Sequence, residues 1–224
     1  MVAGKNIEAV VFDLDGTLLN TLADLKNSVN YALNRFHYPE RTLEEIRNFV
    51  GNGVSTLVRR ALPQGIDDSI HGKVLETFRA HYAEHCMDET KPYEGVPELL
   101  NELKRIGIRA AIVSNKAEFA VKILVDRFFG DTISVAVGDD TKRRRKPAPD
   151  AVFAALEALS LAKERAVYVG DSDVDIQTAT AAGVSLICCT WGFREESFLR
   201  EKGASLFIRK PEDLLPMLRD GTIV

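Results

Sequence analysis

Two groups of aspartates are the residues of this chain best suited to chemistry. Asp13 and Asp15 stand two residues apart, and Asp171 and Asp175 lie in a second acidic segment. Carboxylates that converge repel one another unless a cation lies among them, and oxygen ligands without histidine or cysteine favour Mg²⁺. One carboxylate can also be a nucleophile, while a second protonates a leaving group and then activates water.

Three further residues could bind an anion. Ser114 offers a hydroxyl, Lys146 offers a positive charge, and Gly16 lets backbone N–H groups approach closely. A transferred phosphoryl group needs such donors around its oxygens. Each residue alone could instead be a turn residue, a helix cap or a surface charge. Their joint occurrence at the ends of predicted strands favours phosphoryl transfer.

Short apolar runs rich in valine and isoleucine predict the strands that position these residues. The runs are Ile7–Phe12, Ile108–Val113, Ile133–Val137, Ala166–Val169, Val184–Cys189 and the weaker Leu206–Ile208. Stretches of helical period lie between most of them, at Val96–Ile106, Ala117–Phe128, Asp150–Leu159 and Val174–Ala182. This alternation predicts an α/β fold with a Rossmann-like parallel sheet, in which ligands bind beyond the carboxyl ends of the strands.

The segment 21–90 departs from this alternation because its periods are helical throughout. The predicted helices are Leu22–Arg35, Leu43–Val50, Val54–Leu62 and Asp67–His85, separated by glycine and proline turns. We therefore expect a helical cap domain at 21–90, inserted after the first strand. The catalytic core would comprise residues 1–20 and 91–224.

Composition narrows the class of protein. The chain has 224 residues, of which 46% are hydrophobic and 28% charged, as in ordinary folded proteins. The net charge of -4 argues against nucleic acid as a partner. The basic run Lys142–Lys146 is an exception that we interpret mainly as a solvated loop with one functional lysine; substrate steering or a nucleic-acid patch are the alternatives.

The chain lacks an apolar stretch of the roughly 18–20 residues that span a bilayer, and its start lacks a secretory signal. We expect a cytoplasmic protein without a membrane partner, either a monomer or a homodimer. Its three cysteines, Cys86, Cys188 and Cys189, are too few for a disulfide framework and are predicted to be buried thiols.

The chain resembles the haloacid dehalogenase superfamily over nearly its whole length. The four motifs of that family are matched by Asp13–Leu18, Ser114-Asn115, Lys146-Pro147 and Gly170–Asp175. The helical insertion looks like the cap of the phosphoglycolate phosphatase branch, which typically carries a turn like Val50–Gly53.

The resemblance implies a role for each matched residue. Asp13 would be the nucleophile and Asp15 the acid and base. The phosphate would be bound by Ser114, Asn115 and Lys146. The ligands of Mg²⁺ would be Asp13, the carbonyl of Asp15 and Asp171, with Asp175 as a possible further ligand.

The carboxylate of Asp15 separates branches of the superfamily. Dehalogenase-like members lack it, so its presence here favours a phosphatase or a phosphomutase. We favour a phosphatase that is phosphoglycolate phosphatase-like, because nothing in the chain demands rephosphorylation of a substrate. Pyrophosphate, sugar phosphates and nucleoside monophosphates stay open as substrates.

The cap is expected to select the substrate. We hypothesise that the turn Gly51-Asn52-Gly53 and either Arg59 or Arg60 contact the leaving group, because a guanidinium suits a carboxylate such as that of 2-phosphoglycolate. The alternative is that both arginines lie on a solvated helix face.

Two other classes of protein remain. A phospho-accepting signalling domain also gathers acids, a hydroxyl and a lysine at strand ends, but its size and the order of its motifs differ. A non-catalytic phosphate-binding partner is the other alternative, which the complete set of motif residues argues against.

Overall fold

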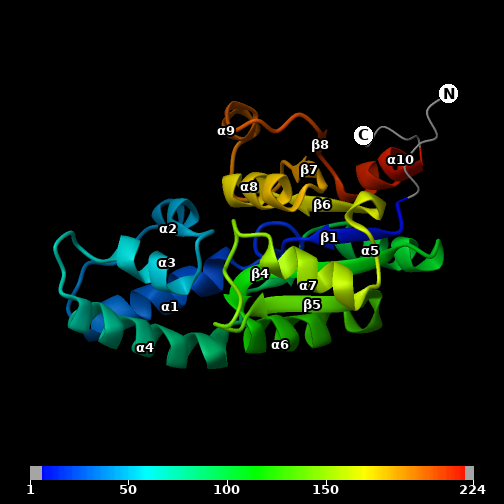
Figure 1. Ribbon diagram of the computed structural model, residues 1–224. Helices are drawn as coiled ribbons and strands as arrows, with labels where there is room; N and C mark the ends of the chain where they lie inside the picture. Colours follow the sequence, from blue (N-terminus) through cyan, green and yellow to red (C-terminus); the bar gives the residue numbers. More distant parts are fainter. Residues whose placement is uncertain (1–6, 220–224) are drawn as a thin grey trace. The chain divides into compact units, whose positions relative to one another are not determined.

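The computed structural model describes residues 7–219 (Figure 1). Contacts divide the chain into two compact units. One unit contains the chain up to Leu19 and from Pro92 onward, and the other is Asn20–Lys91. The first unit is referred to below as the core and the second as the helical unit.

A parallel sheet forms the centre of the core. Across the sheet, the strands are β5 (Ile133–Asp139), β4 (Arg109–Ala117), β1 (Ala9–Phe12), β6 (Ala166–Gly170), β7 (Ser185–Cys189) and β8 (Phe207–Ile208). Ala9 of β1 is in register with Arg109 of β4 on one side and Ala166 of β6 on the other. β1 is therefore a central strand whose two neighbours come from much later in the chain.

Helices cover both faces of this sheet. Val10 and Phe12 pack on one face among residues of α5 (Val96–Arg105), α6 (Glu118–Phe128) and α10 (Leu214–Arg219). Ala9 and Val11 pack on the other face among residues of α7 (Asp150–Ala158) and α8 (Asp173–Ala182). Since successive side chains of a strand point to opposite faces, a strand covered on both sides must be apolar throughout.

The predicted α/β fold class is confirmed by this arrangement. Each predicted strand and helix of the core is present, with ends that shift by a few residues. Several short elements were not predicted: α9 (Glu196–Glu201), α10, and the single turns η1 (Gly130–Thr132), η2 (Lys163–Arg165) and η3 (Pro211–Asp213). Their apolar periods are too short to stand out in a sequence.

The helical unit consists, within the described residues, of α1 (Leu22–Arg35), α2 (Leu43–Phe49), α3 (Val54–Ala61) and α4 (Asp68–His85). α2 begins with a capping box in which Thr42 and Glu45 bind each other's backbone N–H groups. The two chain segments that lead into and out of this unit, β2 (Leu19–Asn20) and β3 (Lys91–Pro92), pair as a two-stranded sheet.

No helix in the described part of the chain combines the length and the apolar character that a membrane crossing needs. The three cysteines are free and buried, as predicted.

A buried carboxylate fixes the end of the helical unit. Asp24 of α1 is 1% exposed and accepts hydrogen bonds from the backbone N–H groups of Glu89 at 2.9 Å and Thr90 at 2.8 Å. These bonds tie the exit segment of the unit to its first helix.

We predict that Asp24→Ala lowers the free energy of unfolding by about 2–4 kcal/mol, because the buried N–H of Thr90 and the partly buried N–H of Glu89 lose a charged acceptor. Urea unfolding followed by circular dichroism measures the change. The matched control is Asp68→Ala, whose carboxylate is 93% exposed and should contribute less than about 0.5 kcal/mol. Equal losses in the two variants would contradict the prediction.

Candidate active site

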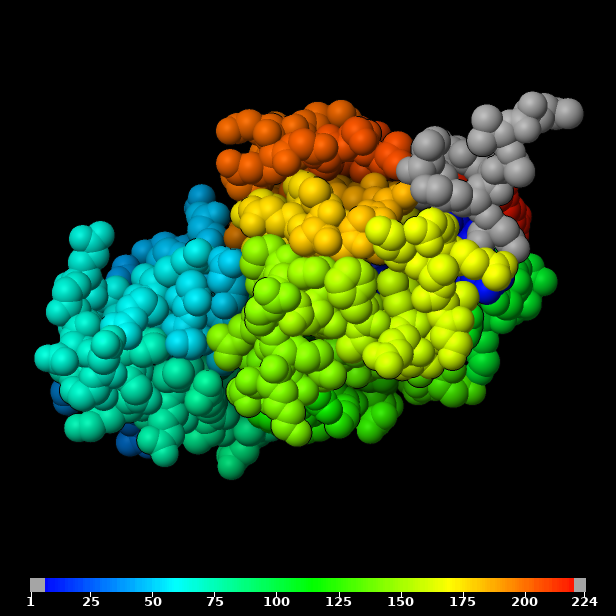
Figure 2. Space-filling view, in the orientation of Figure 1, coloured from blue at the N-terminus to red at the C-terminus, as the bar shows by residue number. Residues whose placement is uncertain are grey.

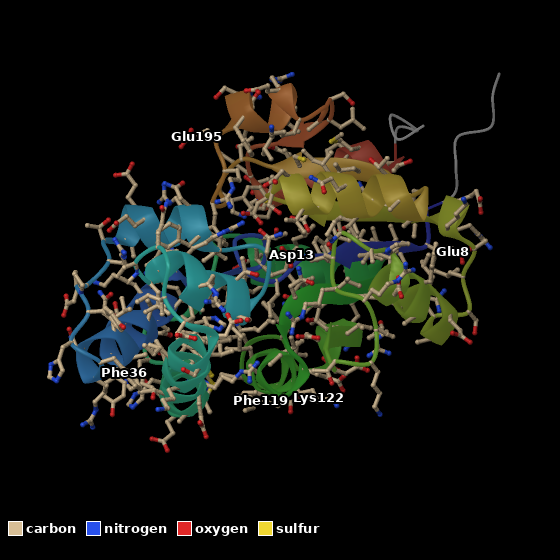
Figure 3. The ribbon with its side chains drawn as sticks, turned by 60° about the vertical axis from the view of Figure 1, so that its left-hand side comes forward. Glu8, Asp13, Phe36, Phe119, Lys122 and Glu195 are labelled. Atoms are coloured by element: carbon tan, nitrogen blue, oxygen red, sulfur yellow. The ribbon has the colours of Figure 1, made fainter. Side chains whose placement is uncertain are left out.

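Three neighbouring strands deliver the predicted residues to one edge of the core sheet. Asp13, labelled in Figure 3, follows the last residue of β1, Ser114 lies near the end of β4, and Asp171 follows β6. These strands lie side by side in the order β4, β1, β6, so their carboxyl ends meet at one edge. All three residues are at most 8% exposed.

Lys146 is the centre of the hydrogen bonds at this edge. Its Nζ lies 2.8 Å from Asp13 Oδ1 and 2.8 Å from Asp175 Oδ1, and it donates to the hydroxyl of Tyr168 at 3.1 Å. The lysine side chain is 3% exposed. A buried ammonium needs such partners to offset the loss of its hydration.

Asn115 holds the backbone of Lys146 in place. Its Nδ2 donates to the carbonyl of Lys146 at 3.0 Å, and its Oδ1 accepts from the N–H of Lys146 at 2.8 Å. Both polar atoms of the amide therefore engage the lysine's main chain. These contacts show that Asn115 positions the main chain of Lys146, and the expected phosphate contact of Asn115 stays a prediction.

Asp171 is held by the residues around its carboxylate. Its Oδ1 accepts from the Thr17 hydroxyl at 3.0 Å and its Oδ2 from the N–H of Phe193 at 2.7 Å. A Cβ on Gly16 would lie 2.4 Å from Asp171 Oδ2, and one on Gly192 would lie 2.5 Å from the same atom. Only glycine permits this close approach of two backbone segments to one carboxylate.

Asp175 uses both oxygens inside the protein. Oδ1 accepts from Lys146 and from Tyr168 at 2.9 Å, and Oδ2 accepts from Ser172 Oγ at 2.6 Å. Ser172 and Asp175 form the capping box of α8. Asp175 therefore fixes Lys146 and begins the helix at the same time.

The carboxylates of Asp13, Asp171 and Asp175 could hold a metal ion together. One oxygen from each lies within 4.8 Å of the others, and all three residues are buried. One lysine cannot balance three carboxylates, so a divalent cation fits the charge that is left over. The oxygen-only donor set is of the kind that hard cations prefer.

Burial sets the pKa values at this site. It raises the pKa of Asp13 well above its usual value, and the charge of Asp175 raises it further. Burial and Asp175 also raise the pKa of Asp171 to about 7. Burial alone would lower the pKa of Lys146, but Asp13 and Asp175 outweigh that effect and hold it well above its usual value. The two carboxylates therefore favour the protonated form of the lysine.

Asp15 does not share these contacts. Its Oδ1 lies 2.7 Å from the Nζ of Lys116, whose side chain is 2% exposed. The backbone N–H of Lys116 donates to the hydroxyl oxygen of Ser114 at 3.3 Å. The two aspartates of the first motif thus face different lysines.

Sequence reasoning missed five contributors to the site. They are Thr17, Lys116, Tyr168, Gly192 and the N–H of Phe193. The first two lie within or directly after predicted motif segments, which was a usable signal. Nothing in the sequence marks Gly192 or Phe193, because their role depends on a backbone approach that only the fold creates.

The basic run before Lys146 is part of an exposed loop on the core (Figure 2). Arg143 pairs with Asp140 at 2.9 Å, Arg144 with Asp150 at 3.0 Å and Arg145 with Asp139 at 2.7 Å. These pairs account for the charges locally and leave Lys146 as the buried member of the run.

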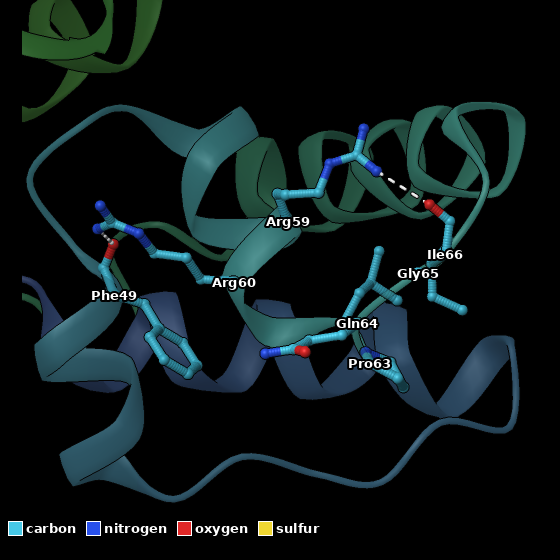
Figure 4. Close-up of a pocket in the computed structure, with 8 residues that line it drawn as sticks. Phe49, Arg59, Arg60, Pro63, Gln64, Gly65 and Ile66 are labelled. Carbon is cyan, nitrogen blue, oxygen red and sulfur yellow. Dashed lines mark hydrogen bonds between the residues drawn. The ribbon is translucent and has the colours of Figure 1, made fainter.

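The residues expected to select the substrate belong to the helical unit. Arg59 donates to Asp68 Oδ1 at 2.5 Å and to the Ile66 carbonyl, whereas Arg60 donates to Phe49 O at 2.9 Å and to Asn52 Oδ1 at 3.0 Å. Both arginines line a pocket of about 390 Å³ (Figure 4). Arg60 therefore holds the turn that contains Gly51, Asn52 and Gly53.

Comparison with known proteins places this geometry in a family. A family model described as haloacid dehalogenase-like hydrolase matches residues 10–189. A phosphoglycolate phosphatase of Pseudomonas savastanoi pv. phaseolicola is 35% identical over 222 residues, which cover 96% of this chain and 81% of that protein.

Two solved structures are also similar. A protein of Lactobacillus delbrueckii subsp. bulgaricus, provisionally described as a phosphoglycolate phosphatase, is 34% identical with a TM-score of 0.91, covering 95% of this chain and 98% of that one. CbbY of Rhodobacter sphaeroides in complex with phosphate is 28% identical with a TM-score of 0.71, covering 93% and 96%.

We predict that binding of a divalent cation at these carboxylates displaces protons near neutral pH. The pKa of Asp171 is about 7 in the folded protein and about 4 in an unfolded chain, so its contribution to stability is present at low pH and is lost as the pH rises through 7. A cation requires the carboxylate form. Titration calorimetry at pH 6.5 in two buffers of different ionisation enthalpy should show proton release, and affinity should rise with pH. Identical heats in both buffers would contradict this.

Proposed function

This chain belongs to the haloacid dehalogenase-like hydrolase family and is a phosphoric monoester hydrolase, and we propose that its preferred substrate is 2-phosphoglycolate. The names of the similar proteins and the cap residues support this choice of substrate. The observation that carries the mechanism is the buried contact of Asp13 with Lys146, beside Asp171.

In the first step, a carboxylate oxygen of Asp13 attacks phosphorus. The new bond from Asp13 to phosphorus forms as the ester P–O bond breaks, and the leaving oxygen takes a proton from Asp15. Water then attacks the aspartyl-phosphate, Asp15 accepts one of its protons, and the bond to Asp13 breaks to release inorganic phosphate. Both aspartates return to their starting states.

The remaining core residues bind and orient the phosphoryl group. The ammonium of Lys146 offsets charge between Asp13 and the phosphoryl oxygens, and the hydroxyl of Ser114 and the backbone next to Gly16 supply hydrogen bonds. Asn115 holds the main chain of Lys146, and Asp175 holds its ammonium group. Each group is held before substrate arrives, so little reorganisation is needed.

Asp13, Asp171 and the carbonyl of Asp15 would hold Mg²⁺. The cation supplies neutralisation of the phosphoryl charge. Asp175 is a weaker candidate for a ligand because each of its oxygens accepts two hydrogen bonds from the protein, whereas each oxygen of Asp171 accepts one.

The helical unit supplies the selection of the leaving group. We assign Arg60 rather than Arg59 to the substrate carboxylate, because the charge of Arg59 is already paired with Asp68, whereas Arg60, within the described residues, donates only to the uncharged oxygens of Phe49 and Asn52. A guanidinium presents two parallel donors to a carboxylate, which glycolate has and most other leaving groups lack.

We predict that Asp13→Asn reduces phosphate release by at least about 10³-fold, because the amide cannot attack phosphorus. Release is measured with and without Mg²⁺ over 2-phosphoglycolate, pyrophosphate, sugar phosphates and nucleotides. The unmodified protein should need the cation and turn over 2-phosphoglycolate best. Faster turnover of another ester would reassign the preferred substrate. No turnover of any ester would refute the assignment of this chain as a phosphoric monoester hydrolase.

We predict that Arg60→Ala raises KM for 2-phosphoglycolate by about 10-fold to 100-fold, which corresponds to one charge-assisted hydrogen bond. Glycerol phosphate, which lacks the carboxylate, should show a much smaller change. Arg59→Ala is the matched control and should leave KM nearly unchanged. If both variants have the KM of the unmodified protein, the assignment of the cap arginines is wrong.

A further inference from the structure

A second buried lysine stands at the edge of the sheet, apart from the one that contacts the nucleophile. Lys116 is the penultimate residue of β4 and is 4% exposed. Its Nζ lies 2.7 Å from Oδ1 of Asp15, and this pair joins residues 101 positions apart in the chain. A lysine is rarely buried without an acidic partner.

Each aspartate of the first motif contacts a different buried lysine. Lys146 contacts Asp13 and Asp175, whereas Lys116 contacts Asp15. Asp13 needs a cation beside it because it approaches an anionic phosphoryl group. Asp15 has a different role in the proposed mechanism, because it must present one oxygen to the leaving group and later to water. A contact at Asp15 therefore serves orientation rather than phosphate binding.

The backbone near the end of β4 fixes the position from which the Lys116 side chain extends. Regular pairing of β4 with β5 shifts register between Val113 and Ala117, the stretch that contains Ser114 and Lys116. Within it the N–H of Lys116 donates to Ser114 Oγ at 3.3 Å. The same irregular stretch of β4 therefore positions both Ser114, whose hydroxyl is proposed to bind phosphate, and Lys116, which binds Asp15.

The carboxyl group of Asp15 can otherwise turn. Its side chain is 16% exposed, so solvent reaches part of it, and rotation about its last torsion is soft. A bond to Oδ1 from a fixed ammonium leaves Oδ2 as the atom that exchanges a proton. Misplacement of a catalytic group by about 1 Å can cost about 10²-fold in rate.

We propose that Lys116 is a positioning residue that orients the Asp15 carboxyl group through Oδ1, so that Oδ2 meets the leaving oxygen. This inference rests on the proposed function. Lys116 acts through Asp15 and does not touch the phosphoryl group. The loss of rate on replacing Lys116 must therefore depend on how much the leaving group needs a proton.

The test compares two esters with the same phosphoryl group. The alcohol that leaves 2-phosphoglycolate needs protonation, whereas 4-nitrophenolate leaves readily without it. We expect Lys116→Met to lower kcat/KM for 2-phosphoglycolate by about 10-fold to 100-fold, and that for 4-nitrophenyl phosphate by less than about 3-fold. The constant kcat/KM is used because it excludes the later hydrolysis of the aspartyl-phosphate.

A double variant separates positioning from other roles. Asp15→Asn removes the group that Lys116 orients, so adding Lys116→Met to it should cost 2-phosphoglycolate less than about 2-fold more. The matched control is Lys122→Met, an identical change at an exposed lysine of α6 labelled in Figure 3, which should leave both constants unchanged.

Equal losses on both esters would overturn the proposal, because Lys116 would then bind the phosphoryl group or support the fold. Additive losses in the double variant would overturn it as well. Should Lys116→Met fail to fold, Lys116→Gln retains a donor for Asp15 and should show the same preference between esters with a smaller loss. If the unmodified protein turns over neither ester, the proposed function fails instead, which is a distinct result.

Discussion

Three buried carboxylates at one edge of the sheet require positive charge, and most of the surrounding structure supplies or holds it. Lys146 bridges Asp13 and Asp175, while Asn115 fixes the lysine's main chain from both sides. Asp175 also begins α8 through its capping box. The same few bonds thus compensate buried charge, start a helix and hold Asp13, the proposed nucleophile. A divalent cation would complete the charge balance that one ammonium leaves unfinished.

The close approach of two backbone segments to Asp171 is the second requirement of the site, because the groups that donate hydrogen bonds to this carboxylate need space beside it. Gly16 and Gly192 come from segments far apart in the chain and both lie against Asp171. A side chain on Gly192 would also lie 2.5 Å from the carbonyl of Gly16, which is backbone and cannot move aside easily. Glycine at these two positions therefore lets both loops approach the carboxylate of Asp171.

The sequence predicted the features that depend on local pattern. Apolar runs in β1 and β6 are continuous because both faces are covered, and the charged residues directly after them mark the ligand edge. The positions of Asp13 and Asp171 followed from that, and Lys146 was predicted from the loop after the third apolar run. Pairings that depend on the fold did not follow, such as Lys116 with Asp15, or Gly192 with Asp171. The two-residue strands β2 and β3 were missed because nothing in so short a segment has a period.

The topology of β1 has a consequence for how the chain emerges from the ribosome. β1 pairs with β4, which begins at Arg109, and with β6, which begins at Ala166. At synthesis rates of about 5–20 residues per second, roughly 5–20 s pass before the nearer partner exists. The helical unit, whose contacts join residues within 20–91, is complete before then. The apolar strand β1, which ends directly before Asp13, must therefore wait unpaired in the nascent chain after every residue of the helical unit has been synthesised.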